Sequence, residues 1–179
     1  MGVSNLTGTL LLTTGNKMEM AVGYATLCGD MCGGYNPLKD LWKTEVFAVC
    51  RWRNALAGAD AAALGRLGPA APVLEAILAR TPTAELEAGQ TDEADLGPYP
   101  EIDAILRALV EDLLDPDAAA KQASAALGHP VESARAWRLA GLLHRAEWKR
   151  RQAAPGPKVG PRNFGLGWRM PITAGGPPA

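Results

Sequence analysis

The sequence is short of cysteine and histidine and has no long apolar run, and each shortage excludes a class of protein. Three cysteines and two histidines occur in 179 residues, and an odd trio of cysteines does not make a disulfide framework. Cys28 and Cys32 are spaced C-x3-C, but His129 and His144 lie far along the chain. A structural zinc site needs two close ligand pairs, so we expect small buried thiols in a reduced, cytoplasmic protein.

The chain also lacks an excess of either charge. Its net charge is −1, with 47% hydrophobic and 21% charged residues, which is ordinary for a globular protein. No basic field argues for nucleic acid or for an anionic membrane. No apolar segment reaches the roughly 20 residues that a membrane-spanning helix needs. We therefore expect one globular domain that binds neither nucleic acid nor membrane.

The first half of the chain predicts a strand followed by helices. Residues 9–14, TLLLTT, form an apolar run between two glycines, and its length is typical of a parallel strand buried on both faces. Helix-forming residues follow at 19–27, and GDMCGGYNP is a glycine-rich loop. The next helix is predicted to begin near Asp40, a plausible N-cap. Its apolar face would comprise Leu41, Val46, Val49, Trp52 and Leu56.

The second half predicts helices between irregular segments. Residues 57–72 are rich in Ala, Gly and Pro, as in a loose insertion, and 80–100 are acidic and aperiodic, as in a long loop. Pro130 is predicted to open a later helix that ends in the basic EWKRRQ. The segment after it is predicted to be an extended surface tail. Before these, an amphipathic helix is predicted from Ile102, Ile105, Leu106, Leu109 and Leu113.

The turn after the predicted strand carries groups able to bind a ligand. Thr14 and Gly15 would stand at the carboxyl end of the strand, where open α/β sheets bind ligands. Glu19 follows within the first helical turn and could hold Mg²⁺ or a polar substrate group. Lys43 could return to the same face and meet a phosphate. From spacing alone, Thr14 could equally cap a helix, and Glu19 could be a solvated acid.

Three blocks of sequence resemble the ammonia-incorporating domain of glutamine-dependent NAD⁺ synthetases. They are LLLTTGNKMEMAVGYATLCGDMCGGYNPLKDLWKTEV, PTAELEAGQTDEADLGPYPEIDAIL and HRAEWKRRQAAPGPKVGPRNFG with RMPIT. The resemblance implies an α/β fold: an incomplete doubly wound, adenine-nucleotide α-hydrolase-like sheet (N-type ATP pyrophosphatase) with a helical C-terminal half. It assigns residues 1–155 to the C-terminal portion of the synthetase domain and 156–179 to a Gly/Pro-rich tail.

The family's chemistry is the ATP-dependent amidation of deamido-NAD⁺ to NAD⁺ through an acyl-adenylate, with Mg²⁺ and usually in a homodimer. Matched by position, the resemblance implies roles for five residues of this chain, none of them catalytic: ATP binding by Thr14, Lys43 and Thr83, deamido-NAD⁺ binding by Glu19 and Lys149, and metal binding by Glu19. The segment from Thr83 to Asp95 resembles a mobile loop that closes over the substrates. Closure would keep water from the acyl-adenylate.

Two departures from the family pattern bear on activity. Met18 stands where family members usually carry a small hydroxyl residue, and a thioether cannot donate a hydrogen bond. It would either crowd the start of the helix or pack beneath it. The sequence also contains no SGG-x-DS phosphate loop and no glutaminase domain. We therefore expect part of a synthetase, competent with a separate N-terminal synthetase or glutaminase chain. The alternative is an inactive remnant that serves as a binding or oligomerisation module.

Overall fold

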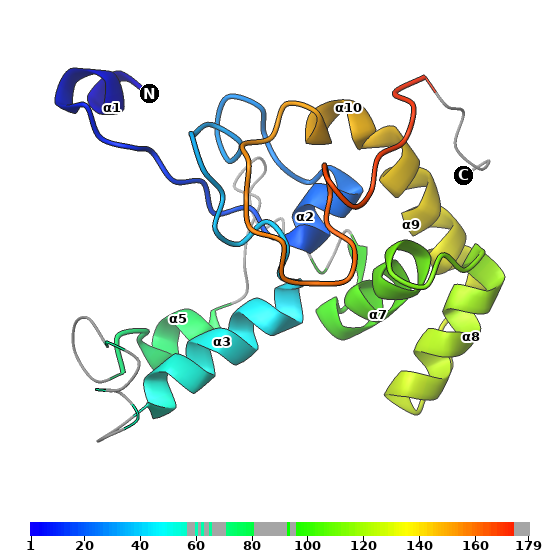
Figure 1. The fold of residues 1–179 in the computed structure, drawn as a ribbon. Coiled ribbons are helices and arrows are strands. Elements are labelled where there is room, and N and C mark those ends of the chain that lie inside the picture. Colours follow the sequence, from blue (N-terminus) through cyan, green and yellow to red (C-terminus); the bar gives the residue numbers. More distant parts are fainter. Residues whose placement is uncertain are drawn as a thin grey trace. The chain divides into compact units, whose positions relative to one another are not determined.

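The computed structural model describes residues 1–56, 60, 62, 65, 71–80, 93 and 96–173. Two compact units make up the chain: one of residues Met1–Lys43 and Pro98–Ala179, the other of Thr44–Gly97. Helices dominate both units (Figure 1). Most of the Ala-rich stretch near residue 60 and the segment that begins at Thr83 lie outside the described residues. In the part that is described, no helix is long and apolar enough to cross a membrane.

The predicted N-terminal strand is present only as one parallel pairing. Leu12 forms an isolated parallel bridge with Tyr35, and Thr13 N–H donates to the Tyr35 carbonyl at 2.9 Å. A Cβ on Gly33 would lie 2.5 Å from Thr13 Cγ2, so glycine permits the two segments to approach. The predicted burial on both faces is wrong here, because Leu10 is 66% and Leu12 52% exposed. No further strand covers them in the described part of the chain.

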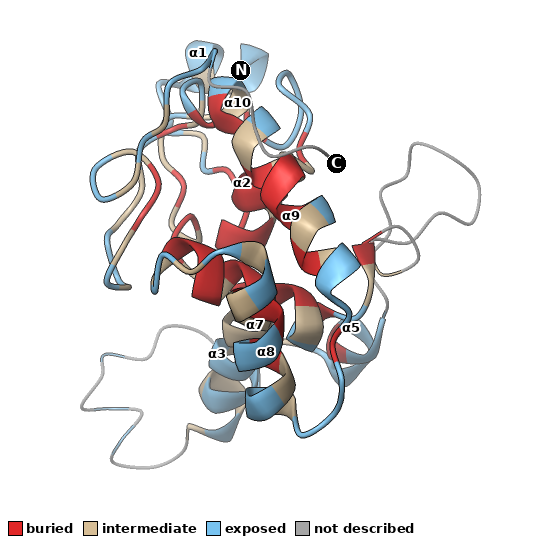
Figure 2. Cartoon of the chain, turned by 90° about the vertical axis from the view of Figure 1, so that its right-hand side faces the viewer, coloured by how far each residue is buried: buried red, intermediate tan, exposed pale blue. Residues whose placement is uncertain are grey.

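The core of the first unit is a layer of packed helices. They are α2 (Lys17–Val22), α7 (Tyr99–Val110), α8 (Pro116–Leu127), α9 (Ser133–Arg145) and α10 (Glu147–Arg150). Helix α7 contacts α8, α9 and α2, and α10 contacts both α2 and α9. Buried residues concentrate on the facing sides of these helices (Figure 2). The predicted stripe is confirmed for Ile102, Ile105, Leu106 and Leu109, whereas Leu113 lies beyond the helix and is exposed.

Helix α8 was not predicted, although its ends carry standard signals. Asp115 is the N-cap and its side chain accepts from the amides of Asp117 and Ala118; Pro116 follows at the first helical position, and Gly128 closes the helix in the left-handed region. The prediction that Pro130 opens the next helix is wrong, because α9 begins at Ser133. The basic segment predicted as its end forms the separate short helix α10.

The remaining helices are α1 (Gly2–Thr7), α3 (Lys43–Ala55) and α5 (Glu75–Ala79). Helix α3 has no buried residue, and two residues of its predicted apolar face, Val49 and Trp52, are 43% and 53% exposed. The prediction that Asp40 caps α3 is wrong, because α3 begins at Lys43. The Asp40 carboxylate is buried and accepts instead from the amides of Val159 and Gly160, both at 2.7 Å.

The segment after α10 is irregular, as predicted, but part of it is buried. The Pro155 carbonyl accepts from Asn36 N–H at 2.8 Å, and a Cβ on Gly156 would lie 2.4 Å from the Asn36 carbonyl oxygen. Asn163 and Phe164 are 5% and 3% exposed. The segment therefore packs against the first unit at residues 155–156 and 163–164. The division of the chain at residue 155 stays a prediction.

Candidate nucleotide-binding site

The turn TGNKME closes into a reciprocal cap at the start of α2. Asn16 Oδ1 accepts from Glu19 N–H at 3.0 Å, and Glu19 Oε2 accepts from Asn16 N–H at 3.0 Å. This capping box satisfies two amides that a helix start leaves without partners. Asn36 Nδ2 also donates to the Gly15 carbonyl at 2.8 Å. The capping box and the Asn36 side chain therefore both hold the turn in place. The spacing of Asn16 and Glu19 is explained by the cap.

Glu19 and Lys43, two of the predicted site residues, lie together. Lys43 Nζ is 3.0 Å from Glu19 Oε1, with side-chain exposures of 12% for the lysine and 18% for the glutamate. The ammonium also lies 5.3 Å from the centre of the Tyr99 ring, within the range of a cation–π contact. The two residues are 24 positions apart in the sequence. Their charged groups form a partly exposed ion pair beside the N-terminal turn of α2.

Lys149, the predicted deamido-NAD⁺ ligand, holds the other end of α2. Its ammonium donates to the carbonyls of Gly23 at 2.7 Å and Ala25 at 3.0 Å. Arg150 beside it donates to the Ala21 carbonyl at 2.9 Å. Burial lowers the pKa of Arg150, and the Glu147 carboxylate opposes this. The last turn of a helix leaves carbonyls without partners, so the basic pair of α10 supplies donors and positive charge to α2.

Glu19 and Lys149 line one hollow with no interior volume open to a water molecule, together with Met20, Gly23, Ala25, Met31 and Arg150. Ligand pockets usually measure roughly 300–1,000 Å³, so this hollow alone is too small for a nucleotide. Thr14 is exposed and does not line it. Thr83 lies outside the described residues. The chain therefore brings Glu19, Lys43 and Lys149 to the two ends of one short helix, with Thr14 two residues before its N-cap.

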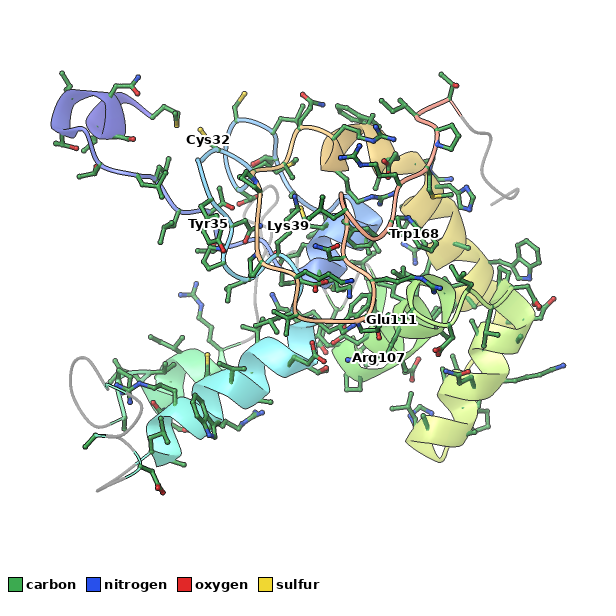
Figure 3. All side chains as sticks on the ribbon, viewed as in Figure 1. Cys32, Tyr35, Lys39, Arg107, Glu111 and Trp168 are labelled. Atoms are coloured by element: carbon green, nitrogen blue, oxygen red, sulfur yellow. The ribbon has the colours of Figure 1, made fainter. Side chains whose placement is uncertain are left out.

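One ionic cluster beside α2 was not found from the sequence. Lys17 is fully buried; its ammonium lies 2.9 Å from Asp40 Oδ1, 2.8 Å from Glu111 Oε1 and 2.6 Å from the Arg162 carbonyl. Trp42 Nε1–H also donates to Glu111 Oε1 at 2.9 Å. Figure 3 shows Glu111 beside Arg107, whose guanidinium is 3.3 Å away. The sequence around Lys17 does not predict this burial, because a single lysine among helix-forming residues is usually exposed.

Met18 is also fully buried, so it packs beneath α2 rather than facing the ligand side. The described residues include no group of three or more His, Cys, Asp or Glu side chains that could hold a metal ion. Among the described residues at the candidate site, Glu19 is the acidic side chain that could reach a cation, once Lys43 releases its Oε1. A magnesium ion usually takes one or two protein carboxylates and completes its shell with phosphates and water, and a single carboxylate fits that pattern.

A family model described as NAD synthase matches residues 1–153. This chain belongs to the NAD synthase family. The glutamine-dependent NAD(+) synthetase of Xanthomonas campestris pv. campestris is 48% identical over 178 residues, covering 98% of this chain and 28% of that protein. The synthetase of Rhodobacter capsulatus is 48% identical over 173 residues, with 96% and 29% covered.

A solved structure shows the fold of this NAD synthase family member. The crystal structure of a glutamine-dependent NAD(+) synthetase from Cytophaga hutchinsonii matches with a TM-score of 0.68 at 22% identity, covering 97% of this chain and 26% of that one. The α/β fold class predicted from the sequence is therefore confirmed at that level. The doubly wound sheet is not seen in the described residues. The chain spans less than a third of the length of these relatives.

Proposed function

We propose that this chain supplies one part of the site that amidates deamido-NAD⁺ to NAD⁺ at the expense of ATP. The observation that carries the proposal is the Glu19–Lys43 ion pair at the start of α2, in a chain that a NAD synthase model matches over residues 1–153. The parallel pairing of Leu12 with Tyr35 supports a doubly wound sheet whose other strands come from outside this chain. The homodimer stays a prediction from the resemblance, and the cytoplasmic location stays a prediction from the cysteine content.

The chemistry requires a better leaving group and the dispersal of phosphate charge. A carboxylate is a poor electrophile until one of its oxygens attacks the α-phosphorus of ATP, which releases pyrophosphate and gives the acyl-adenylate. Ammonia then attacks the acyl carbon and loses a proton, and AMP leaves. Cations placed where charge develops on the transferring phosphate lower the barrier. In our proposal, ATP draws Lys43 Nζ from Glu19 Oε1 to a phosphate oxygen. The released Glu19 carboxylate would then hold Mg²⁺, which neutralises phosphate charge when bound.

Thr14 and Lys149 would complete this part of the site. Thr14 is exposed and hydrogen-bonds to no described residue, so its hydroxyl is open to ATP. Lys149 lines the same hollow as Glu19, which suits a contact to deamido-NAD⁺. Thr83 is proposed as a second hydroxyl for ATP on the basis of the resemblance. The glycine-rich phosphate loop would come from an N-terminal synthetase segment, either in the same protein or in a separate chain.

A full-length chimera tests the proposal. This chain replaces the matched segment of the Xanthomonas campestris relative, and NAD⁺ formation from deamido-NAD⁺, ATP, Mg²⁺ and ammonia is measured. We expect turnover, and a loss of about tenfold or more in kcat/KM for Glu19→Gln and for Lys43→Met. Lys121→Met, on the exposed side of α8, serves as the matched control.

Two results would contradict the proposal. A folded chimera with no turnover would favour the alternative, in which this chain is an inactive module that only binds or assembles. That alternative draws on the missing SGG-x-DS motif. An active chimera in which Glu19→Gln and Lys43→Met match the Lys121→Met control would instead show that the site lies elsewhere.

A further inference from the structure

Lys17 holds together the two segments that carry the ion pair of the candidate site. It stands two residues before the glutamate of that pair, and it contacts the three residues that directly precede the lysine, Lys43. Its backbone N–H donates to the Leu41 carbonyl at 2.8 Å. Its ammonium lies 2.9 Å from Asp40 Oδ1 and 4.8 Å from the centre of the Trp42 ring. One residue therefore fixes the turn at the start of α2 to the segment that ends at Lys43.

The Lys17 ammonium is also closed off from water by groups that belong to neither segment. It lies 2.8 Å from Glu111 Oε1 and donates to the Arg162 carbonyl at 2.6 Å. The backbone of Gly160 passes so close that a Cβ there would lie 3.2 Å from Lys17 Nζ. The side chain has no exposed surface. Because water cannot replace a lost partner here, moving the two segments apart would leave a buried charge without compensation, which is costly.

Stability alone does not explain a charge at this position. Well-packed hydrophobic residues in place of a buried ion pair often leave the free energy of unfolding unchanged or raise it. A buried charge can instead add conformational specificity, since its partners must lie at fixed places. For Lys17, one of those partners is Asp40, three residues before Lys43. The requirement therefore falls on the spacing between the two segments of the candidate site.

We propose that Lys17 is a positioning residue for the ATP-dependent step. It sets the distance between the backbone that carries Glu19 and the backbone that carries Lys43, so that the two side chains can take Mg²⁺ and a phosphate oxygen between them. This role rests on the proposed function and extends it to a residue whose buried ammonium touches no substrate. Charges lower a barrier best when they are in place before charge develops on the transferring group. A misplacement of about 1 Å can reduce a rate roughly 100-fold.

The test is Lys17→Met in the full-length chimera, with ATP, Mg²⁺ and deamido-NAD⁺ varied in turn below the melting temperature of each variant. We expect KM for ATP and the Mg²⁺ concentration at half-maximal rate each to rise about tenfold. KM for deamido-NAD⁺ should stay unchanged. Only folded chimera turns over, so a loss of folded protein lowers the apparent kcat and leaves these constants as they are. The measurement therefore separates positioning from stability.

A second variant and a control make the test independent of how well Lys17→Met folds. In Asp40→Asn the side-chain oxygen can still accept from the amides of Val159 and Gly160, but the charge opposite Lys17 is gone. We expect a smaller rise in KM for ATP. Val131→Ala is the matched control, because Val131 is buried in the connection between α8 and α9. It should lower the melting temperature and leave KM for ATP unchanged.

The two lysines should act on one and the same interaction with ATP. Lys17→Met combined with Lys43→Met should therefore raise KM for ATP no further than Lys43→Met alone, as for residues that are coupled. Effects of the two changes that multiply in the double variant would show that they act independently, and would contradict the positioning role.

Two further sets of results would overturn this role. If Lys17→Met and Asp40→Asn had the ATP and Mg²⁺ constants of the Val131→Ala control, Lys17 would only stabilise the fold. Should Glu19→Gln and Lys43→Met lose activity in the same experiment, the proposed function would stand without the positioning role. If Glu19→Gln and Lys43→Met had no effect, or if the folded chimera had no turnover, the proposed function would fail and the role of Lys17 with it.

Discussion

Replacing Lys17 with methionine would leave two buried carboxylates without the charge that they share. Lys17 has no exposed surface, and its ammonium lies within 2.9 Å of both Asp40 Oδ1 and Glu111 Oε1. It also donates to the Arg162 carbonyl at 2.6 Å. Methionine has a similar length and can fill the space, so the change removes charge and hydrogen bonds rather than volume.

The expected loss of stability follows from what remains around each carboxylate. Breaking a buried ion pair by removing one partner costs about 3–5 kcal/mol. Glu111 would keep the Trp42 indole and Arg107, and Asp40 would keep the amides of Val159 and Gly160. These donors reduce the penalty, so we expect about 3 kcal/mol. Domains of this size have total stabilities of roughly 5–15 kcal/mol, so the variant should fold with a clearly lower urea midpoint.

Urea unfolding followed by tryptophan fluorescence and circular dichroism measures the difference. Lys121→Met is the matched control, and an exposed change of this kind stays within about 0.5 kcal/mol. Adding Glu111→Gln to Lys17→Met should recover part of the loss, because it removes one uncompensated charge. Equal stabilities for Lys17→Met and Lys121→Met would refute the reasoning, and so would a double variant less stable than Lys17→Met alone.

Three further predictions concern single features of the first unit. Asn16→Ala removes the N-cap of α2 and should cost about 1 kcal/mol, measured as a lower urea midpoint; no change would mean that the cap is not needed. Leu113→Gly relieves a left-handed conformation and should raise stability by about 1 kcal/mol; a loss would show that the leucine packs more favourably than the strain costs. His144 has a lowered pKa, so the stability it contributes is present above the ordinary histidine pKa of about 6.5 and is lost as the pH falls below it. His144→Gln should therefore flatten the fall in melting temperature between about pH 7 and 5, and an unchanged fall would contradict the assignment to His144.

The sequence predicted local features best where a pattern is repeated or confined to adjacent residues. The stripe Ile102–Leu109 has a helical period, and helix α7 follows from it. Asn16 and Glu19 at a spacing of three are the signature of a capping box, whereas our predictions for Glu19 are only a ligand role or a solvated position. The family resemblance rests on three long blocks, and for that reason it was more specific than any single motif.

The features that the sequence did not predict depend on contacts between distant residues. Asp40 was interpreted as a helix cap because its neighbours are helix formers, yet a buried ammonium and two amides from residues 159–160 engage it. An apolar run such as TLLLTT indicates a buried strand only if neighbouring strands cover it. Tyr35 is the sole recorded partner of Leu12 within the described residues. Whether an apolar strand is buried depends on the neighbouring strands and helices that cover it, and not on the sequence of the strand itself.

The two candidate lysines differ in what they must give up in order to bind a ligand. Lys43 would exchange the partly exposed Glu19 carboxylate for a phosphate, which is another anionic oxygen partner, and its ammonium lies beside the Tyr99 ring as well. Lys149 would lose its bonds to the carbonyls of Gly23, the C-cap of α2, and of Ala25 in the loop after it. Hydrogen bonds of a charged donor contribute about 1.5–3 kcal/mol each. In the chimera, Lys43→Met should therefore raise KM for ATP with little change in unfolding. Lys149→Met should lower the melting temperature of the chimera. Any reduction of kcat/KM should then be indirect, caused by displacement of the end of α2. If Lys149→Met instead raised KM for deamido-NAD⁺ with unchanged stability, Lys149 would be a direct ligand despite its carbonyl contacts.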